Sequence, residues 1–283
     1  MKKRLLILSL TLILALITGG CSTSPKSNSQ SQQVLPSSTA QTEAGQAPAE
    51  TMTISIAAAA SLETILNKDL IPQFEEKNQG IKVEGTYDSS GKLEKQIEEG
   101  MTVDVFFSAA TKQMDQLSST GLISDNTRVD LLKNKIVLII PANATSGITK
   151  FEDITKANKI AIGDPASVPA GQYAKEALTS LGLWDKVSAK ASLGTNVTEV
   201  LNWIAEGSAE AGIVYATDAK LQPDKIKIVA EAPSGSLKKD VIYPIAVIKA
   251  STKQEAAQKF VDFLTSEAAI QKFESYGFTN AKK

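Results

Sequence analysis

Four segments place small or hydroxyl-bearing residues where a helix is expected to begin. They are Ser61 after four alanines, Ser89-Ser90-Gly91, Pro169-Ala170-Gly171 and Thr195-Asn196-Val197. A helix N-terminus exposes free backbone N–H groups and carries a partial positive charge, so it can bind an anion. Hydroxyl groups add neutral donors, and small side chains let a ligand approach the backbone. Together these helix starts could surround an oxyanion with N–H and O–H donors, without any arginine.

Each helix start by itself also has a simpler explanation. Serine or asparagine before a helix is more often a plain cap, and proline is common in a first helical turn. Gly171 could simply relieve crowding, and Tyr215, at the end of an apolar strand, is more often a core residue. Composition and spacing alone therefore indicate only an α/β protein that could bind an anion.

The composition excludes several classes of function. The 283 residues include no histidine and one cysteine, so they cannot form a Ser-His-Asp triad, a Cys-His pair, a histidine metal site or an internal disulfide. The 30 lysine and arginine residues nearly balance the 31 acidic residues. A nucleic-acid-binding protein would normally carry a basic patch or stripe, so no nucleic-acid partner is expected.

The first fifty residues are predicted to lie outside the folded part. Residues 1–20 combine a positive start with an apolar run that is too short to span a bilayer, which is typical of a secretory signal peptide. Cys21 follows directly and resembles the lipidated cysteine of a bacterial lipobox; the alternative is an ordinary cleaved signal with a spare thiol. Residues 21–50 are rich in serine, glutamine and threonine, which predicts a disordered tether.

From Met52 onward, apolar strands alternate with helical patterns. Strands are predicted at 53–58, 81–86, 103–108, 135–141, 159–162, 211–215, 225–229 and 241–248. Helices are predicted after each of the four segments above, with Pro72 kinking or dividing the first and Asn196 capping the fourth, and over 253–265 and 266–275. This alternation implies parallel sheets covered by helices, in which strand carboxyl ends and helix N-termini face one crevice.

Several blocks of the sequence resemble the molybdate-binding proteins of bacterial ABC importers, which are two-lobed, class II solute-binding proteins. The matching blocks are AAAASL at 57–62, SSGKLEKQIEEGMTVDVFFSA at 89–109, AIGDPASVPAGQYAKEALTSLGLWDK at 161–186, GIVYATDA at 212–219, VIYPIAVI at 241–248 and KFESYGF at 272–278. The resemblance extends over residues 52–280. It implies an α/β fold of two lobes, each a mostly parallel sheet with helices on both faces. The first lobe would comprise 52–134 plus 240–283, and the second 135–239.

The resemblance also implies which residues hold the tetrahedral anion. The two serine positions of the family fall on Ser61 and Ser90, with Ser89 as the adjacent alternative. The positions that act through a backbone N–H fall on Ala170 and Val197. The tyrosine that acts through its phenol falls on Tyr215. The metal would be bound as its oxyanion, without direct metal ligands and without a cofactor.

The implied function is that of a receptor anchored to the cell membrane, outside the cytoplasm, by a lipid on Cys21. It would capture molybdate or tungstate and deliver it to the permease of an ABC transporter, without catalysis and as a monomer. Both anions are fully ionised near pH 7 and need only donors, whereas hydrogen phosphate also requires an acceptor. Sulfate is satisfied by donors too, but it is smaller.

Alternative functions remain open at this stage. The same scaffold could select sulfate or phosphate, because Asp88 could supply an acceptor; a solvated Asp88 at the loop edge is the simpler interpretation. Lys92, in the first turn of a helix, could add to the positive electrostatic field at the anion site, or it could simply be exposed to solvent. A lipid-anchored serine hydrolase using Ser61 or Ser90, with Lys92 as the base, is a more remote alternative.

Overall fold

The computed structural model describes residues 51–282. The predicted signal peptide, Cys21 and the predicted tether lie outside these residues. Within 51–282, none of the helices combines the length and the apolar character that a membrane span requires.

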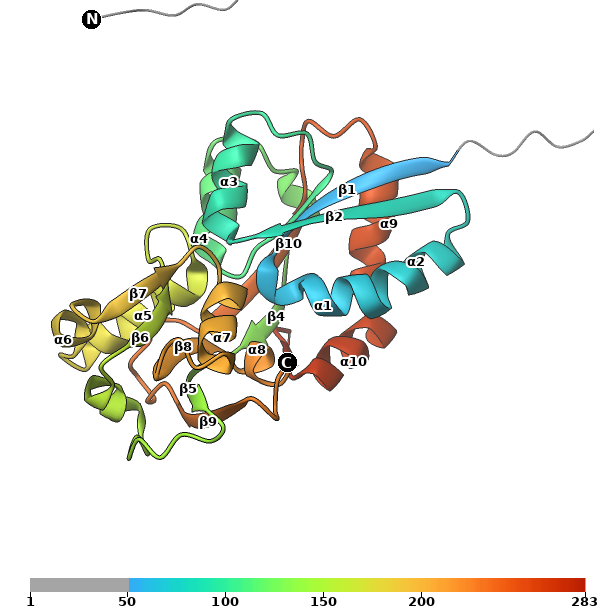
Figure 1. Ribbon diagram of the computed structural model, residues 1–283. Coiled ribbons are helices and arrows are strands. Elements are labelled where there is room, and N and C mark those ends of the chain that lie inside the picture. Colours follow the sequence, from blue (N-terminus) through green and yellow to red (C-terminus); the bar gives the residue numbers. More distant parts are fainter. Residues whose placement is uncertain (1–50, 283) are drawn as a thin grey trace, which may run out of the picture. The chain divides into compact units, whose positions relative to one another are not determined.

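The described chain forms two sheets, each with its own helices (Figure 1). We refer to the six-stranded sheet with its helices as lobe I and to the five-stranded sheet with its helices as lobe II. The strand order is β11-β4-β10-β3-β1-β2 in lobe I and β7-β6-β8-β5-β9 in lobe II. The strands of lobe I are β1 (Met52–Ala59), β2 (Ile81–Asp88), β3 (Val105–Phe107), β4 (Val129–Asn134), β10 (Val241–Val247) and β11 (Thr279–Asn280). Those of lobe II are β5 (Ile136–Pro141), β6 (Ile160–Gly163), β7 (Ala191–Gly194), β8 (Ala211–Tyr215) and β9 (Ile226–Glu231).

The predicted two-lobed α/β fold is confirmed, although the sheets are mixed rather than mostly parallel. In lobe I, β1 is parallel to β2 and β3, whereas β10 is antiparallel to β3 and β4. In lobe II, β6 is parallel to β7 and β8, whereas β5 is antiparallel to β8 and β9. Each of these antiparallel pairs contains β4, β5 or β10, which are strands next to the points where the chain passes from one sheet to the other.

The helices surround these sheets, and several begin next to a strand end. Lobe I carries α1 (Glu63–Ile65), α2 (Ile71–Lys77), α3 (Ser90–Glu98), α4 (Thr111–Ser119), α9 (Gln254–Leu264) and α10 (Glu267–Tyr276). Lobe II carries α5 (Pro169–Ser180), α6 (Trp184–Ser188), α7 (Val197–Ala205) and α8 (Ala216–Ala219). A π-helical segment, Leu66–Leu70, precedes α2 and separates it from α1. Pro72 lies in the first turn of α2, so the helical segment changes its hydrogen-bond pattern next to the proline, and it continues without a break from Glu63 to Lys77.

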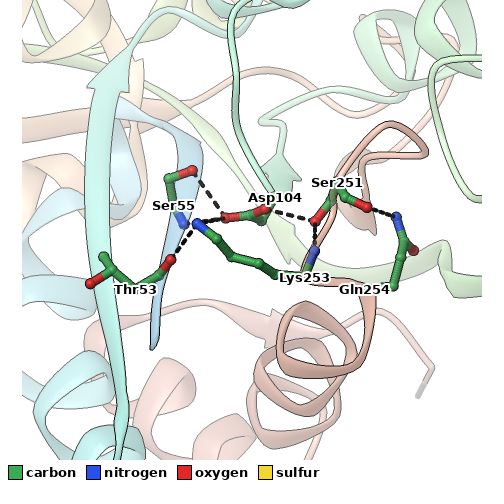
Figure 2. A network of polar contacts seen from close by, with 6 residues as sticks. All are labelled: Thr53, Ser55, Asp104, Ser251, Lys253 and Gln254. Atoms are coloured by element: carbon green, nitrogen blue, oxygen red, sulfur yellow. Dashed lines mark hydrogen bonds and ion pairs between the residues drawn. The ribbon is translucent and has the colours of Figure 1, made fainter. Parts of the chain in front are cut away.

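A buried carboxylate fixes the amino-terminal ends of β1 and β3 (Figure 2). Asp104, directly before β3, accepts hydrogen bonds from the backbone N–H of Ser55 at 2.7 Å and from the hydroxyl of Ser251 at 2.6 Å. The Lys253 Nζ lies 3.7 Å from the same carboxylate and donates to the Thr53 carbonyl. This network ties β1 to the segment before α9, at the end of the strands opposite to the predicted binding residues.

A second buried carboxyl group, that of Asp218 in α8, accepts a hydrogen bond from the backbone N–H of Tyr215 at 3.2 Å. Burial raises the pKa of Asp218 from its ordinary value of 3.8 to about 7, and the Tyr215 hydrogen bond opposes this shift only in part. The folded protein therefore holds this proton over a pH range in which the unfolded chain has released it.

We expect Asp104→Ala to lower the free energy of unfolding by roughly 2–4 kcal/mol, because it leaves the Ser55 N–H and Lys253 without their buried partner. Chemical denaturation measures this loss. Asp115→Ala serves as the control, since its ion pair with Arg128 lies at the surface and should contribute below about 1 kcal/mol. Equal losses for the two variants would contradict the role assigned to Asp104.

We expect Asp218→Asn to stabilise the protein at pH 8 and to have little effect near pH 4. The pKa of Asp218 is raised in the folded state. Its contribution to the free energy of unfolding is therefore most favourable at a pH below its unfolded-state pKa, and it is lost as the pH rises towards 7. Asparagine keeps an acceptor for the Tyr215 N–H but does not titrate. The advantage at pH 8 should reach up to about 4 kcal/mol. Melting curves across this range test it, with the exposed Asp262→Asn as control; a pH-independent difference would refute it.

Candidate functional site

The six predicted binding residues line one cavity of about 190 Å³ between lobes I and II. The cavity is lined by Ala59, Ala60, Ser61, Asp88, Ser89, Ser90, Ala109, Val168, Pro169, Ala170, Val197 and Tyr215. Its walls are mostly buried, since Ser90 and Ala170 are 0 % exposed and Ser61 is 7 % exposed, and only Asp88 at its edge is half-buried. The described conformation is therefore closed around this cavity.

The lobe I wall forms where three neighbouring strands end. β1 leads into a 3-10 turn, Ala60–Leu62, which contains Ser61. β2 continues through Asp88, so only Ser89 separates it from α3, where a wider turn was predicted. Because β1 is parallel to β2 and β3, these strand ends lie side by side. The arrangement places Ser61, Ser90 and Ala109 on one wall.

The lobe II wall is made by two helix N-termini and the end of a strand. Ala170 lies in the first turn of α5 and Val197 begins α7, so neither N–H has an acceptor within its own helix. Asn196 caps α7 by accepting from the backbone N–H of Glu199 at 3.0 Å, as predicted. Gly171 fits because a Cβ there would lie 1.9 Å from the Gly163 carbonyl oxygen. This close approach seats α5 directly on the end of β6.

Hydroxyl groups complete the set of donors. The Ser90 Oγ accepts from the backbone N–H of Ala109 at 2.9 Å, which leaves its own proton available. The Tyr215 phenol donates to the Ala109 carbonyl at 3.4 Å, across the two lobes. Burial raises the pKa of Tyr215 well above its usual range, so it remains a donor. The Ser89 Oγ is buried and has no hydrogen-bond partner, which is unusual for a polar atom and fits a group that awaits a ligand.

Asp88 is the one acidic residue among the described residues that line the cavity. One oxygen accepts from the backbone N–H of Ser89 at 2.8 Å, and the other forms an ion pair with Lys92 at 2.5 Å. The Lys92 side chain is 52 % exposed. Asp88 therefore matches neither of the two interpretations given above in full. It lies at the cavity wall, but Lys92 balances its charge and each of its oxygens already has a donor.

Contacts between the lobes hold the cavity closed. The backbone N–H of Gly91 in α3 donates to the Ser167 carbonyl at 2.9 Å. Gln113 in α4 donates to Gln172 in α5 at 3.3 Å. A Cβ on residue 91 would lie 2.5 Å from the Ser167 oxygen and 2.9 Å from its Cα, so only glycine permits this approach without a shift.

Sequence reasoning did not assign roles to three residues of the site and its support. Ala109 follows the apolar strand β3, and its place at a strand carboxyl end was a signal that could have identified it. Tyr243 contacts Ser61 at 3.0 Å, and Asn134 contacts Tyr243 at 3.2 Å. Neither carries a recognisable local signal, because both are brought to Ser61 by long-range strand pairing.

Comparisons with known proteins identify the family of this chain. Residues 54–279 match the family model described as bacterial extracellular solute-binding protein. The chain is 40 % identical to YvgL of Bacillus subtilis (strain 168), named as a candidate ABC transporter substrate-binding lipoprotein, over 81 % of this chain and 86 % of that protein. It is 37 % identical to the molybdate-binding protein ModA of Escherichia coli (strain K12), over 83 % of this chain and 92 % of ModA.

A solved structure shows the same fold. The substrate binding domain of a candidate molybdenum ABC transporter from Clostridium difficile superposes with a TM-score of 0.63 at 39 % identity, over 81 % of this chain and 99 % of that domain. The family match covers nearly all of the described residues. The chain therefore belongs to the bacterial extracellular solute-binding proteins, which bind a solute for transport and are not enzymes.

Proposed function

We propose that this protein binds molybdate, and equally tungstate, in the cavity between its lobes and delivers the anion to an ABC importer. The observation that carries the proposal is the meeting of Ser61, Ser90, Ala170, Val197 and Tyr215 at one buried cavity. Each carries a neutral N–H or O–H group, and the Tyr215 phenol would have to turn its proton from the Ala109 carbonyl to the anion. Ser89 is a sixth candidate, because its buried hydroxyl has no partner in the protein.

The lining favours a fully ionised oxyanion. It offers several donors and a single carboxylate, that of Asp88, whose two oxygens already accept from the Ser89 N–H and from Lys92. Hydrogen phosphate would bring a proton that needs an acceptor, and burying it without one would be unfavourable. The small size of the cavity also favours a small ion over a drug-sized ligand.

The relatives support the choice of anion and the mode of attachment. ModA of Escherichia coli is named for molybdate, and the Clostridium difficile domain for molybdenum. YvgL is named as a lipoprotein, which supports a lipid on Cys21 that holds this protein at the outer side of the cell membrane. We further propose that lobe I spans 52–134 plus 240–283 and lobe II 135–239, a division supported by which strands share a sheet.

Calorimetric titration of the protein expressed without residues 1–20 tests the proposal. We expect molybdate and tungstate to bind at least about 100-fold more tightly than sulfate or phosphate, which corresponds to roughly two lost charge-assisted hydrogen bonds. A thousandfold preference for sulfate would assign the scaffold to sulfate instead.

Removing the serine hydroxyls should weaken binding stepwise. Ser61→Ala and Ser90→Ala should each lower molybdate affinity by roughly 10- to 100-fold, because each removes one hydrogen bond to a charged ligand. Ser275→Ala, an exposed hydroxyl on α10, is the matched control. If the double variant at 61 and 90 bound molybdate as tightly as the parent, the anion would have to bind elsewhere.

Gly91→Ala should weaken molybdate binding by opposing closure of the lobes. Its Cβ would meet the Ser167 backbone, which cannot rotate away as a side chain could. An overpacked contact of this kind costs about 1–3 kcal/mol, so we expect a roughly 5- to 150-fold loss of affinity with a nearly unchanged melting temperature of the ligand-free protein. Calorimetry and small-angle X-ray scattering with and without molybdate measure both effects. Lys95→Ala, an exposed change on the same helix, is the control and should alter neither the molybdate affinity nor the closure of the lobes. Unchanged affinity in Gly91→Ala would show that Gly91 is not needed for closure.

A further inference from the structure

A buried chain of polar side chains runs from Ser61 to the point where the main chain crosses between the lobes. The Ser61 Oγ lies 3.0 Å from the Tyr243 phenol oxygen. The Asn134 amide nitrogen lies 3.2 Å from the same phenol oxygen and 2.8 Å from the Thr217 hydroxyl. Asn134 is the last residue of β4, immediately before the chain enters lobe II, and Thr217 belongs to α8 of lobe II. All four side chains are buried.

The backbone fixes the orientation of the Asn134 amide, with which this chain begins. The N–H of Lys135 donates to the Asn134 Oδ1 at 2.8 Å, and because a backbone N–H can only donate, the amide orientation follows. The Asn134 Nδ2 must then donate to Tyr243. The phenol accepts this bond and has one proton left; its hydrogen-bonding neighbours are the Ser61 Oγ, at 3.0 Å, and the Tyr215 phenol, and we assign the proton to Ser61. Burial raises the pKa of Tyr243 well above its usual range, so the phenol keeps that proton.

The consequence concerns the proton of Ser61. A serine hydroxyl can act as donor or acceptor, and a free one could offer either a proton or a lone pair to a ligand. With its oxygen accepting from Tyr243, Ser61 is left with a proton that points away from Tyr243. Ser61 lines the cavity, so this proton is available to a bound anion.

The second serine of lobe I is set in the same way by a different partner. The Ser90 Oγ accepts from the backbone N–H of Ala109 at 2.9 Å, and its own proton is therefore also free. Both serines accept from the protein and can donate into the cavity. The Ala109 N–H orients the Ser90 hydroxyl directly, whereas the orientation of the Ser61 hydroxyl depends on the side chains of Tyr243 and Asn134.

We propose that Tyr243 and Asn134 are positioning residues that make Ser61 an obligatory hydrogen-bond donor and so select fully ionised oxyanions over protonated ones. The inference rests on the proposed function for the identity of the anion, but the direction of the hydrogen bonds is a property of the protein without ligand. In a chain of opposite direction, Ser61 would present a lone pair, which repels a dianion and accepts the proton of hydrogen phosphate.

Neutron diffraction of the ligand-free, deuterium-exchanged protein tests the direction without any anion. We expect the Tyr243 deuteron to lie between the phenol oxygen and Ser61 Oγ, and both Asn134 amide deuterons to point at Tyr243 and Thr217. A Ser61 deuteron directed at Tyr243 would overturn the inference, whatever the protein binds. Titration of the parent protein with molybdate separately tests the proposed function.

Variants test the consequence for binding, measured by calorimetry with molybdate at pH 8.5. Tyr243→Phe should weaken binding roughly 5- to 30-fold, because the Ser61 hydroxyl loses the bond that orients it. In a Ser61→Ala background the same change should alter affinity less than about twofold, because the two residues act through one hydrogen bond. Tyr276→Phe removes a phenol that bonds Asp69 instead, and it should leave affinity unchanged.

Asn134→Asp provides the sharper test. An ionised carboxylate in place of the amide would accept from Tyr243, so Ser61 would have to donate to the phenol and present its lone pair to the anion. We expect Asn134→Asp to lower molybdate affinity more than Tyr243→Phe does. The double variant with both changes should bind as tightly as Tyr243→Phe alone, because without the phenol the reversed hydrogen-bond direction does not reach Ser61. Additive losses in the double variant would show that the carboxylate acts through its charge alone. That result, or parental affinity in Tyr243→Phe, would overturn the inference.

Discussion

The proposed anion site depends on bringing hydroxyl groups of lobe I together with backbone N–H groups and a phenol of lobe II at one small cavity. Helix N-termini and hydroxyl groups carry only partial charges, and their field falls off within about one helical turn. They can hold a dianion only if several of them lie at hydrogen-bond distance and water is kept out, since a low-dielectric surrounding strengthens each contact. Closure of the two lobes is therefore part of the chemistry: Ser61 and Ser90 come from one sheet, and Ala170, Val197 and Tyr215 from the other.

This requirement explains the small residues around the cavity. Gly171 lets α5 approach the end of β6, and Gly91 lets α3 reach Ser167 across the lobes. A side chain at either position would hold donors away from the anion. The Asp88–Lys92 pair fits the same requirement, because a net charge at the wall would outweigh the neutral donors, and the pair balances itself at the edge of the cavity.

A polar support lies behind these donors. A neutral hydroxyl is useful to a dianion only when its proton faces the ligand, and burial alone does not decide this. Asn134 is held by its own neighbouring backbone N–H, and Tyr243 connects it to Ser61. The support begins where β4 continues into β5, so the orientation of one donor is linked to the segment that joins the lobes. The Asp104 network stabilises the other end of the same strands and makes no contact with the cavity.

The sequence by itself determined the local elements and much of the site. Apolar runs and caps predict β1, β5, β8 and the start of α7 at Asn196, because these depend on side-chain periodicity and nearby hydrogen bonds. Segments with mixed polarity, such as β4, escaped prediction since sheet neighbours fix them. Recognisable blocks pointed to Ser61, Ser90, Ala170, Val197 and Tyr215, and that these bind the anion stays a prediction. Only the tertiary structure decided the antiparallel crossings, the balanced state of Asp88, and the hydrogen bond between Tyr243 and Ser61, 182 positions apart. Such contacts depend on how distant strands pair, which no local pattern of residues encodes.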